Sequence, residues 1–404
     1  MILLRRHFLL LAAVCLIFAA SAGCAGASKP GTVTQKSENI ELLRFRWKKT
    51  LFSNIPNFNI PAFYEEHDRF NPIETGAAAF DTDAHRLFVG AAIGGLYCLE
   101  IGSGDTVWRF NLDDPVGSTP YYDAARKTVY FGADDGYLYR VHSRSGRLIW
   151  KVDTGAELRR NVHMHADTVF VVNADNTVLA IDPEGGEIIW RYRREPVEGF
   201  SSVGHADLKI AGASVLTGFS DGFVVSLDAG TGVVNWEMDL ATDAVAEADA
   251  DDVLLVDVDA TPVVVDNIVV AASLAGGVYG LDLESGNVRW IRSDLTKVTG
   301  AASSATEAYM VRAGRKGLVT LNPQNGHTHK EMLFGVGLKA DPLPYDDVLL
   351  ISDSEAGLYI VSAGTGRVLN LLDMDGGFFA RPAQFAGYLL IMGNLSTLFS
   401  FALN

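Results

Sequence analysis

Cysteine is scarce in this chain, and the placement of the three cysteines argues against both a disulfide and a cysteine-based metal site. Cys15 and Cys24 lie near the N-terminus, and Cys98 lies in a short apolar segment that reads as a strand. We expect Cys15 to leave with an export signal and Cys24 to be modified. The mature chain then has no second free thiol for a disulfide and no cysteine-based metal site. Cys98 is expected to be buried, where a thiol packs as a small apolar side chain.

Basic residues are also few relative to acidic ones. Lysine and arginine number 33 against 49 aspartates and glutamates, so the formal net charge is −16. Nucleic acid and anionic lipid head groups are therefore unsuitable partners. The 48% hydrophobic and 20% charged residues are ordinary for a soluble domain.

The period of an amphipathic helix is missing as well, and a different repeat takes its place. A glycine precedes a tryptophan by four residues in five copies, and two further copies keep the glycine and lose the ring. The pairs are Gly104–Trp108, Gly146–Trp150, Gly186–Trp190, Gly232–Trp236 and Gly286–Trp290, followed by Gly326–Lys330 and Gly366–Asn370. Before each glycine, alternating apolar residues flank a tight turn such as Asp135-Gly136, which indicates antiparallel strands. In the third copy Asn176 takes the glycine position, as a left-handed backbone allows.

The repeat predicts an all-β, eight-bladed β-propeller of four-stranded antiparallel blades, occupying residues 40–404 as a single domain. The stretch from Phe80 to Asn404 holds eight units of about 40 residues. The last unit stops before its glycine and tryptophan, and Trp47 supplies the missing part. We therefore expect the first strand to complete the last blade and close the ring, which leaves few open sheet edges. Seven blades are the alternative.

The N-terminus has the layout of a bacterial export signal over residues 1–23. Arg5 and Arg6 precede an apolar run from Phe8 to Ala20, which is too short to span a membrane. The small residues that end at Cys24 resemble a lipobox, the site at which bacterial lipoproteins are cleaved and acylated. This resemblance implies lipidation at Cys24, with the plain soluble periplasmic protein as the alternative.

The residues after Cys24 read as a lipidated flexible tether over residues 24–39, since they are rich in small and polar side chains. Ala25, rather than aspartate, follows the cysteine, which by resemblance favours sorting to the outer membrane. The Arg5-Arg6 pair also resembles a twin-arginine export signal, so the export route stays open between that route and the general one.

No arrangement of residues calls for an enzyme, a metal or a cofactor. His163 with His165, and His327 with His329, are two i, i+2 pairs, but no third ligand is evident for zinc. The segment Gly199–Gly204 contains serines without the strand–turn–helix of a hydrolase nucleophile. The glycine pairs open strands rather than helices, so they do not form a dinucleotide site.

The longest spacing in the repeat holds an acidic segment, Ala241 to Thr261, between units four and five. Its carboxylates are Asp243, Glu247, Asp249, Asp251, Asp252, Asp257 and Asp259. A calcium site, a solvated acidic loop and a partner surface all fit this composition. Long loops on a rigid scaffold often carry binding residues, which favours the partner surface.

The Gly–Trp unit resembles the quinoprotein-type propeller repeat over nearly all of residues 40–404. The stretch from Asp257 to Trp290, taken with the lipobox, is similar to the BamB family, the propeller lipoproteins of the outer-membrane β-barrel assembly machinery. This resemblance implies a non-enzymatic scaffold that binds the periplasmic POTRA domains of BamA and helps unfolded outer-membrane protein precursors to reach it.

The resemblance also implies roles for particular residues. Asp257 and Asp259 match an aspartate pair that the family uses toward BamA, and we expect both to bind the partner. A second family patch carries leucines and an arginine, but here the region reads Gly199–Gly204, with Val203 in place of the arginine. An exported propeller that binds another cell-envelope protein or polymer therefore stays open, as does a quinone-dependent dehydrogenase.

Overall fold

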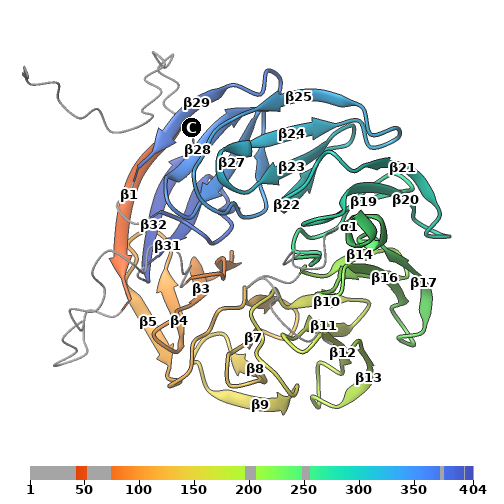
Figure 1. Cartoon of the computed structure of the whole chain (residues 1–404). Helices are drawn as coiled ribbons and strands as arrows, with labels where there is room; N and C mark the ends of the chain where they lie inside the picture. The colour runs from red at the N-terminus through yellow and green to blue at the C-terminus, as the bar shows by residue number, and fades with distance from the viewer. Residues whose placement is uncertain are drawn as a thin grey trace, which may run out of the picture. The chain divides into compact units, whose positions relative to one another are not determined.

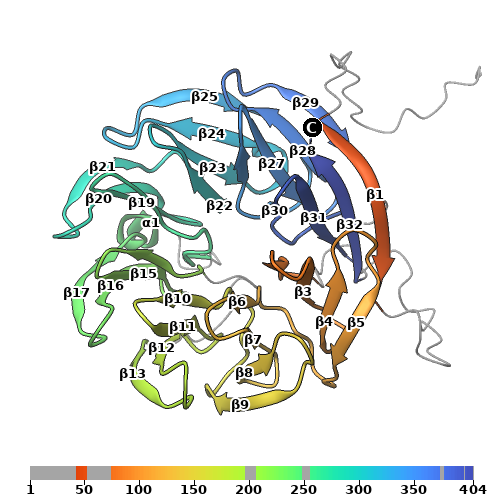
Figure 2. The same ribbon diagram turned by 180° about the vertical axis from the view of Figure 1, so that it is seen from behind.

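The ring that the repeat predicts is present in the computed structural model, which describes residues 42–51, 74–195, 206–247, 255–373, 377–394 and 396–403. All of these lie in the unit Asn39–Asn404. Their strands form eight four-stranded antiparallel sheets arranged as blades around a common axis (Figure 1, and from behind in Figure 2). The eight-bladed β-propeller is thus confirmed. The predictions for the signal, the tether and Cys24 lie outside the described residues.

Blades 1 to 4 each consist of four consecutive strands, running from a short innermost strand to the outermost one. They are β2 (Ala79–Asp81), β3 (Arg86–Gly90), β4 (Leu96–Glu100) and β5 (Thr106–Phe110); β6 (Tyr121–Asp123), β7 (Thr128–Gly132), β8 (Tyr137–His142) and β9 (Leu148–Asp153); β10 (His163–His165), β11 (Thr168–Val172), β12 (Thr177–Ile181) and β13 (Ile188–Arg193); and β14 (Lys209–Ala211), β15 (Ser214–Gly218), β16 (Phe223–Asp228) and β17 (Val234–Asp239).

Blades 5 to 7 repeat this order, and blade 8 takes its outermost strand from the other end of the chain. The strands are β18 (Val263–Val265), β19 (Ile268–Ser273), β20 (Gly277–Asp282) and β21 (Val288–Arg292); β22 (Val298–Ser303), β23 (Ala308–Arg312), β24 (Leu318–Leu321) and β25 (Thr328–Met332); β26 (Leu343–Tyr345), β27 (Val348–Asp353), β28 (Gly357–Ser362) and β29 (Val368–Leu372); and β30 (Ala383–Phe385), β31 (Tyr388–Gly393), β32 (Thr397–Leu403) and β1 (Leu43–Thr50). Two short helices accompany them, α1 (Thr242–Glu247) and the 3-10 turn η2 (Gly314–Lys316).

The middle strands of a blade are the most buried, whereas an innermost strand such as β10 is half-buried. Every residue of β7 and of β12 is buried, whereas the outer strand β9 alternates between exposed and half-buried residues. Middle strands are covered on both faces by neighbouring blades, while the blades splay apart toward the rim. Apolar clusters fill the spaces between neighbouring blades, as where Val270 and Val278 of blade 5 pack with Met310 and Val319 of blade 6. Each blade therefore depends on both neighbours for its core.

The repeated Gly–Trp pair works across two blades rather than within one. A Cβ on Gly146 would lie 2.6 Å from the ring of Trp108 in the preceding blade, so only glycine allows the ring to pack there. Every tryptophan also donates its indole N–H to a backbone carbonyl of the next blade, over 2.8 to 3.3 Å. The acceptors are Ile101 for Trp47, Ser143 for Trp108, Pro183 for Trp150, Ala229 for Trp190, Leu283 for Trp236 and Pro323 for Trp290.

The two copies without tryptophan have different explanations. Lys330 keeps the interblade bond, because its Nζ donates to the carbonyl of Ala363 over 3.1 Å, beside Gly366. Asn370 faces blade 8, whose third and fourth strands are β32 and β1 and are not joined by a turn. That blade offers no turn glycine for an indole to pack against, so a tryptophan at position 370 would have no partner of the usual kind.

The first described strand closes the ring, as expected from Trp47. β1 pairs antiparallel with β32 from Leu43 opposite Leu403 to Thr50 opposite Thr397. Beyond β1, the carbonyl of Leu51 accepts the hydroxyl of Tyr97 from blade 1, at 2.9 Å. The closure therefore joins the two ends of the chain within blade 8 by strand pairing, without a covalent link, and the prediction of an N-terminal strand in the last blade is confirmed.

Candidate functional site

A cavity of about 1000 Å³ lies at the centre of the ring, and all eight blades contribute to its wall. Its lining comes mostly from connections that lead into an innermost strand, such as those before β10 and β22, and from turns between second and third strands. In antiparallel blades these segments share one end of the strands, which we call the cavity face. The volume is at the upper end of the range of small-molecule pockets.

Most of the cavity wall is apolar, and charged groups are set into it. The larger apolar side chains are Phe80, Leu255, Leu274, Leu338, Leu343, Phe379 and Pro382. The charged residues are Arg159, Arg160, Lys297, Lys339 and Arg381, with Asp207, Asp259 and Asp341. A mostly apolar wall with a few charged groups is typical of a ligand pocket.

Two of the cavity carboxylates are held by neighbouring blades. Asp341 accepts from the backbone amide of Ala301 over 2.8 Å and from the hydroxyl of Thr261 over 3.0 Å. Burial raises the pKa of Asp341 despite these bonds. Asp207 accepts from Asn161 and contacts His163 Nε2 at 2.9 Å, and the charge of Asp207 raises the pKa of His163 against the opposing effect of burial.

The histidine pairs thus have ordinary polar partners. His163 contacts Asp207, and His329 contacts Glu307 over 3.1 Å. Across the residues that the structure describes, no three histidine, cysteine, aspartate or glutamate side chains come together as metal ligands would. Cys98 is buried as predicted, and burial raises the pKa of its thiol to about 12, so it stays protonated.

The acidic connection between blades 4 and 5 begins with a helix that the sequence pattern does not predict. Asp239 ends β17 and accepts from the amides of Ala241 and Thr242 over 2.7 and 3.1 Å, which starts α1 (Figure 1). Such side-chain caps satisfy amides at a helix start. Val245 of α1 and Leu255 farther along are exposed apolar residues, at 54% and 38%. This connection therefore presents apolar as well as acidic groups.

Asp257 and Asp259 lie in the same connection but in different surroundings. Asp257 is buried, with 2% exposure, and its carbonyl accepts the amide of Leu274. Asp259 is half-buried and lines the central cavity. Only Asp259 is therefore accessible from the cavity side. The second family patch, at Gly199–Gly204, lies outside the described residues.

Two further buried carboxyl groups stand at blade junctions on the cavity face, and the sequence pattern singled out neither. Glu74, at the junction of blades 8 and 1, accepts from the amide of Ala92 at 3.0 Å and from the hydroxyl of Ser396. Burial raises the pKa of Glu74 to about 7. At the junction of blades 6 and 7, Asp353 lies 3.4 Å from Lys339 Nζ, with both side chains fully buried.

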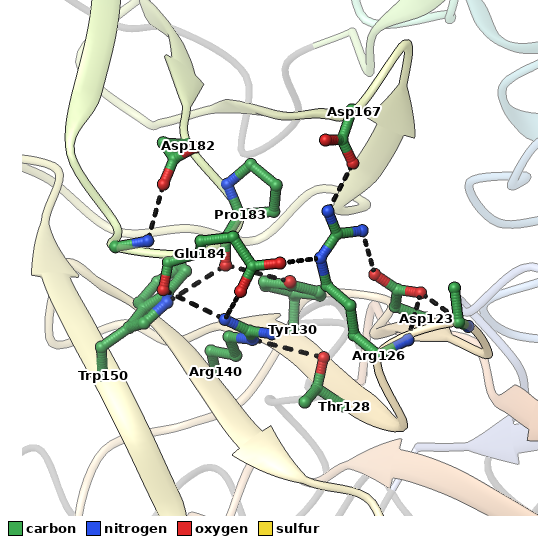
Figure 3. A network of polar contacts seen from close by, with 12 residues as sticks. Asp123, Arg126, Thr128, Tyr130, Arg140, Trp150, Asp167, Asp182, Pro183 and Glu184 are labelled. Atoms are coloured by element: carbon green, nitrogen blue, oxygen red, sulfur yellow. Dashed lines mark hydrogen bonds and ion pairs between the residues drawn. The ribbon is translucent and has the colours of Figure 1, made fainter.

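A charged cluster occupies the opposite face between blades 2 and 3 (Figure 3). Arg126 donates to Asp123, Asp167 and Glu184 over 3.0, 2.5 and 2.6 Å, and Arg140 also reaches Glu184 at 3.3 Å. Both arginines are thus satisfied by the protein itself, and we assign the cluster a structural role in holding the two blades together.

Sequence reasoning missed most of the cavity residues, because they come from connections in all eight blades. A usable signal exists nonetheless. Arg160, Lys297 and Arg381 all stand a few residues before an innermost strand, at β10, β22 and β30. Alignment of the repeats by these connections would have brought these three residues together.

In the described part of the chain, no helix has the length and hydropathy needed to cross a membrane.

Known proteins resemble this chain in sequence and in fold. The family model described as outer membrane protein assembly factor BamB matches residues 92–332, more than half of the chain. The BamB protein of Yersinia pestis is 24% identical over 355 residues, which cover 83% of this chain and 84% of that protein.

Among solved structures, BamB from Moraxella catarrhalis superposes with a TM-score of 0.69 and 20% identity, over 81% of this chain and 96% of that one. Quinohemoprotein alcohol dehydrogenase from Comamonas testosteroni gives a TM-score of 0.64 at 13% identity, over 91% of this chain and 78% of that one. At such low identity these similarities concern the fold alone.

Proposed function

Since the chain belongs to the family of outer membrane protein assembly factor BamB, we propose that it is a non-enzymatic scaffold of outer-membrane β-barrel protein assembly. In this role it binds the periplasmic POTRA domains of a BamA-like partner and brings unfolded outer-membrane precursors to them. Acyl chains on Cys24 hold it at the periplasmic face of the outer membrane. The observation that carries the proposal is the family match over residues 92–332.

The connection between blades 4 and 5 is the proposed docking surface. It is a long segment on a rigid ring, and it combines exposed Val245 and Leu255 with the half-buried carboxylate of Asp259. Apolar contacts exclude water around a charged pair, which strengthens that pair. Asp259 would accept charge-assisted hydrogen bonds from a partner's arginine or lysine. Asp257 is too deeply buried for this and would instead hold the connection in shape.

Calorimetry of purified POTRA domains against variants of this chain tests the proposal. Asp259→Asn keeps the side-chain shape and removes the charge, so binding should weaken by about 2 to 5 kcal/mol if the carboxylate is buried in the complex. Asp113→Asn is the matched control, because Asp113 is exposed in the connection between blades 1 and 2. Equal affinity for all three proteins would reject the docking surface. The absence of binding even by the unmodified chain would favour another envelope partner.

Lipidation has a separate test. Cys24→Ser should move the protein from washed membranes to the soluble fraction, because several acyl chains at about 0.8 kcal/mol per buried methylene anchor a protein firmly. Recovery of that variant in washed membranes would reject the anchor.

A further inference from the structure

Three cations in the wall of the central cavity form no ion pair with a described carboxylate. Arg159 is paired with Asp134 over 3.0 Å. By contrast, no described carboxylate lies within ion-pair distance of Arg160, Lys297 or Arg381, although the chain as a whole has a net charge of −16. Arg160 is half-buried in the wall, and Lys297 and Arg381 are exposed within the cavity. Three solvent-accessible cations beside an apolar wall can therefore receive an anionic ligand.

Two carboxylates of the same wall, Asp341 and Asp207, are already engaged with the protein. The charges of Arg381 and Arg160 both act on Asp341, so the two guanidinium groups approach the same part of the cavity. Yet Asp341 uses its two oxygens on Ala301 and Thr261 and does not form an ion pair with either arginine. The pair formed by Asp207 with His163 is likewise complete.

The backbone of Lys297 indicates that its position is imposed by the fold. Its φ is 63°, in the left-handed region that side chains with a Cβ seldom adopt. The amide of Lys297 donates to Leu274 over 2.8 Å, and its carbonyl accepts from Ala313 over 2.9 Å. Neighbouring turns thus hold the residue in this left-handed conformation.

We propose that the central cavity binds a small organic anion, a carboxylate on an apolar body, with Arg160 and Arg381 holding the carboxylate and Lys297 adding charge. The apolar body would cover the wall formed by residues such as Phe80, Leu343 and Phe379. An inorganic anion would leave this wall uncovered, and a neutral apolar molecule would remove water from the cations without pairing them. The cavity shares Leu255 and Asp259 with the docking surface between blades 4 and 5, but the inference uses neither residue.

Calorimetry with two matched probes tests the site. The full-length protein should bind 2-naphthoate with one site per chain, and about ten-fold or more tighter than the neutral analogue 2-naphthalenemethanol, because hydrogen bonds to charged groups are worth more than neutral ones. The double variant R160Q/R381Q should bind naphthoate no more tightly than the alcohol, while its affinity for the alcohol stays unchanged.

Two other variants keep the result interpretable. R147Q/R191Q removes two exposed arginines from the outer part of the ring, so it matches the charge change and should bind naphthoate normally. Lys297→Asn removes one cavity charge and should fold, because asparagine tolerates the left-handed backbone. We expect it to lose part of the affinity for naphthoate. This variant tests the site even if the double arginine variant fails to fold. Equal affinity for the two probes, or equal loss in the cavity and outer variants, would overturn the proposal.

Discussion

The junction between blades 6 and 7 and the junction between blades 8 and 1 each bury one carboxyl group, but they surround it differently. Asp353 accepts from four backbone amides over 3.0 to 3.3 Å, those of Val336, Gly337, Glu355 and Ala356, and it faces Lys339. Glu74 has the amide of Ala92 and the hydroxyl of Ser396. Both side chains are buried, so the two sites differ in how many hydrogen-bond donors face the carboxyl group.

The cation beside Asp353 has its own set of partners. Lys339 Nζ donates to the carbonyls of Arg312, Gly314 and Gly337 over 3.1, 2.6 and 3.2 Å. Burial lowers the pKa of Lys339, and the nearby Asp353 opposes that effect. This pair links two blades that are continuous in the chain. Glu74, which has fewer hydrogen-bond donors, stands beside blade 8, in which the two ends of the chain meet by strand pairing.

The largest expected effect comes from removal of that closure. Deleting residues 43–50 takes β1 from blade 8 and exposes the edge of β32, which can pair with other chains. We expect a destabilisation of more than about 5 kcal/mol and oligomers in size-exclusion chromatography. Deleting residues 28–38 is the control and should leave melting unchanged. A monomeric 43–50 deletion with the parent's melting temperature would contradict the assigned role of β1.

The second-largest expected effect concerns the buried pair of Asp353 and Lys339 between blades 6 and 7. Asp353→Asn leaves Lys339 buried without its counter-charge, and breaking a buried pair in this way costs about 3 to 5 kcal/mol. Urea unfolding measures the loss, with exposed Asp347→Asn as the control. Adding Lys339→Met should recover part of the stability, because the unpaired charge is then gone. An unchanged urea midpoint in the single variant would show that the pair is not needed.

The third effect is a pH dependence of stability that comes from Glu74, beside the closure of the ring. The folded protein raises the pKa of Glu74 from 4.5 to about 7, so the folded state binds this proton more tightly than the unfolded state. The group therefore costs stability as the pH rises from about 4.5 to 7, by about 3 kcal/mol in total. Glu74→Gln removes this cost, so it should be more stable than the parent at pH 8 and similar to it at pH 4.5.

Urea unfolding at these two pH values compares Glu74→Gln with the parent and with Glu284→Gln, whose side chain is exposed. The control should follow the parent at both pH values. If Glu74→Gln also follows the parent at pH 8, the carboxyl group is not the pH-sensitive part of the closure.

Much of the fold was predictable, because the signals that define it are local. The apolar runs of β7 and β12 predict strands, and Asn176 has the left-handed backbone expected at its turn, with φ 50°. The helix α1 was missed, since six residues are too few to show a helical period and its cap depends on one side chain, Asp239.

The sequence by itself predicted eight blades and their closure, because five units carry the Gly–Trp pair, two more keep its glycine, and Trp47 stands alone at the other end of the chain. It also nominated Asp257 and Asp259 together. Only the tertiary structure separated them, burying Asp257 and placing Asp259 in the cavity wall. The cavity cations could not be grouped from spacing, since they meet only when the ring closes. A repeat specifies each blade locally, whereas the axis of the ring belongs to all eight blades at once.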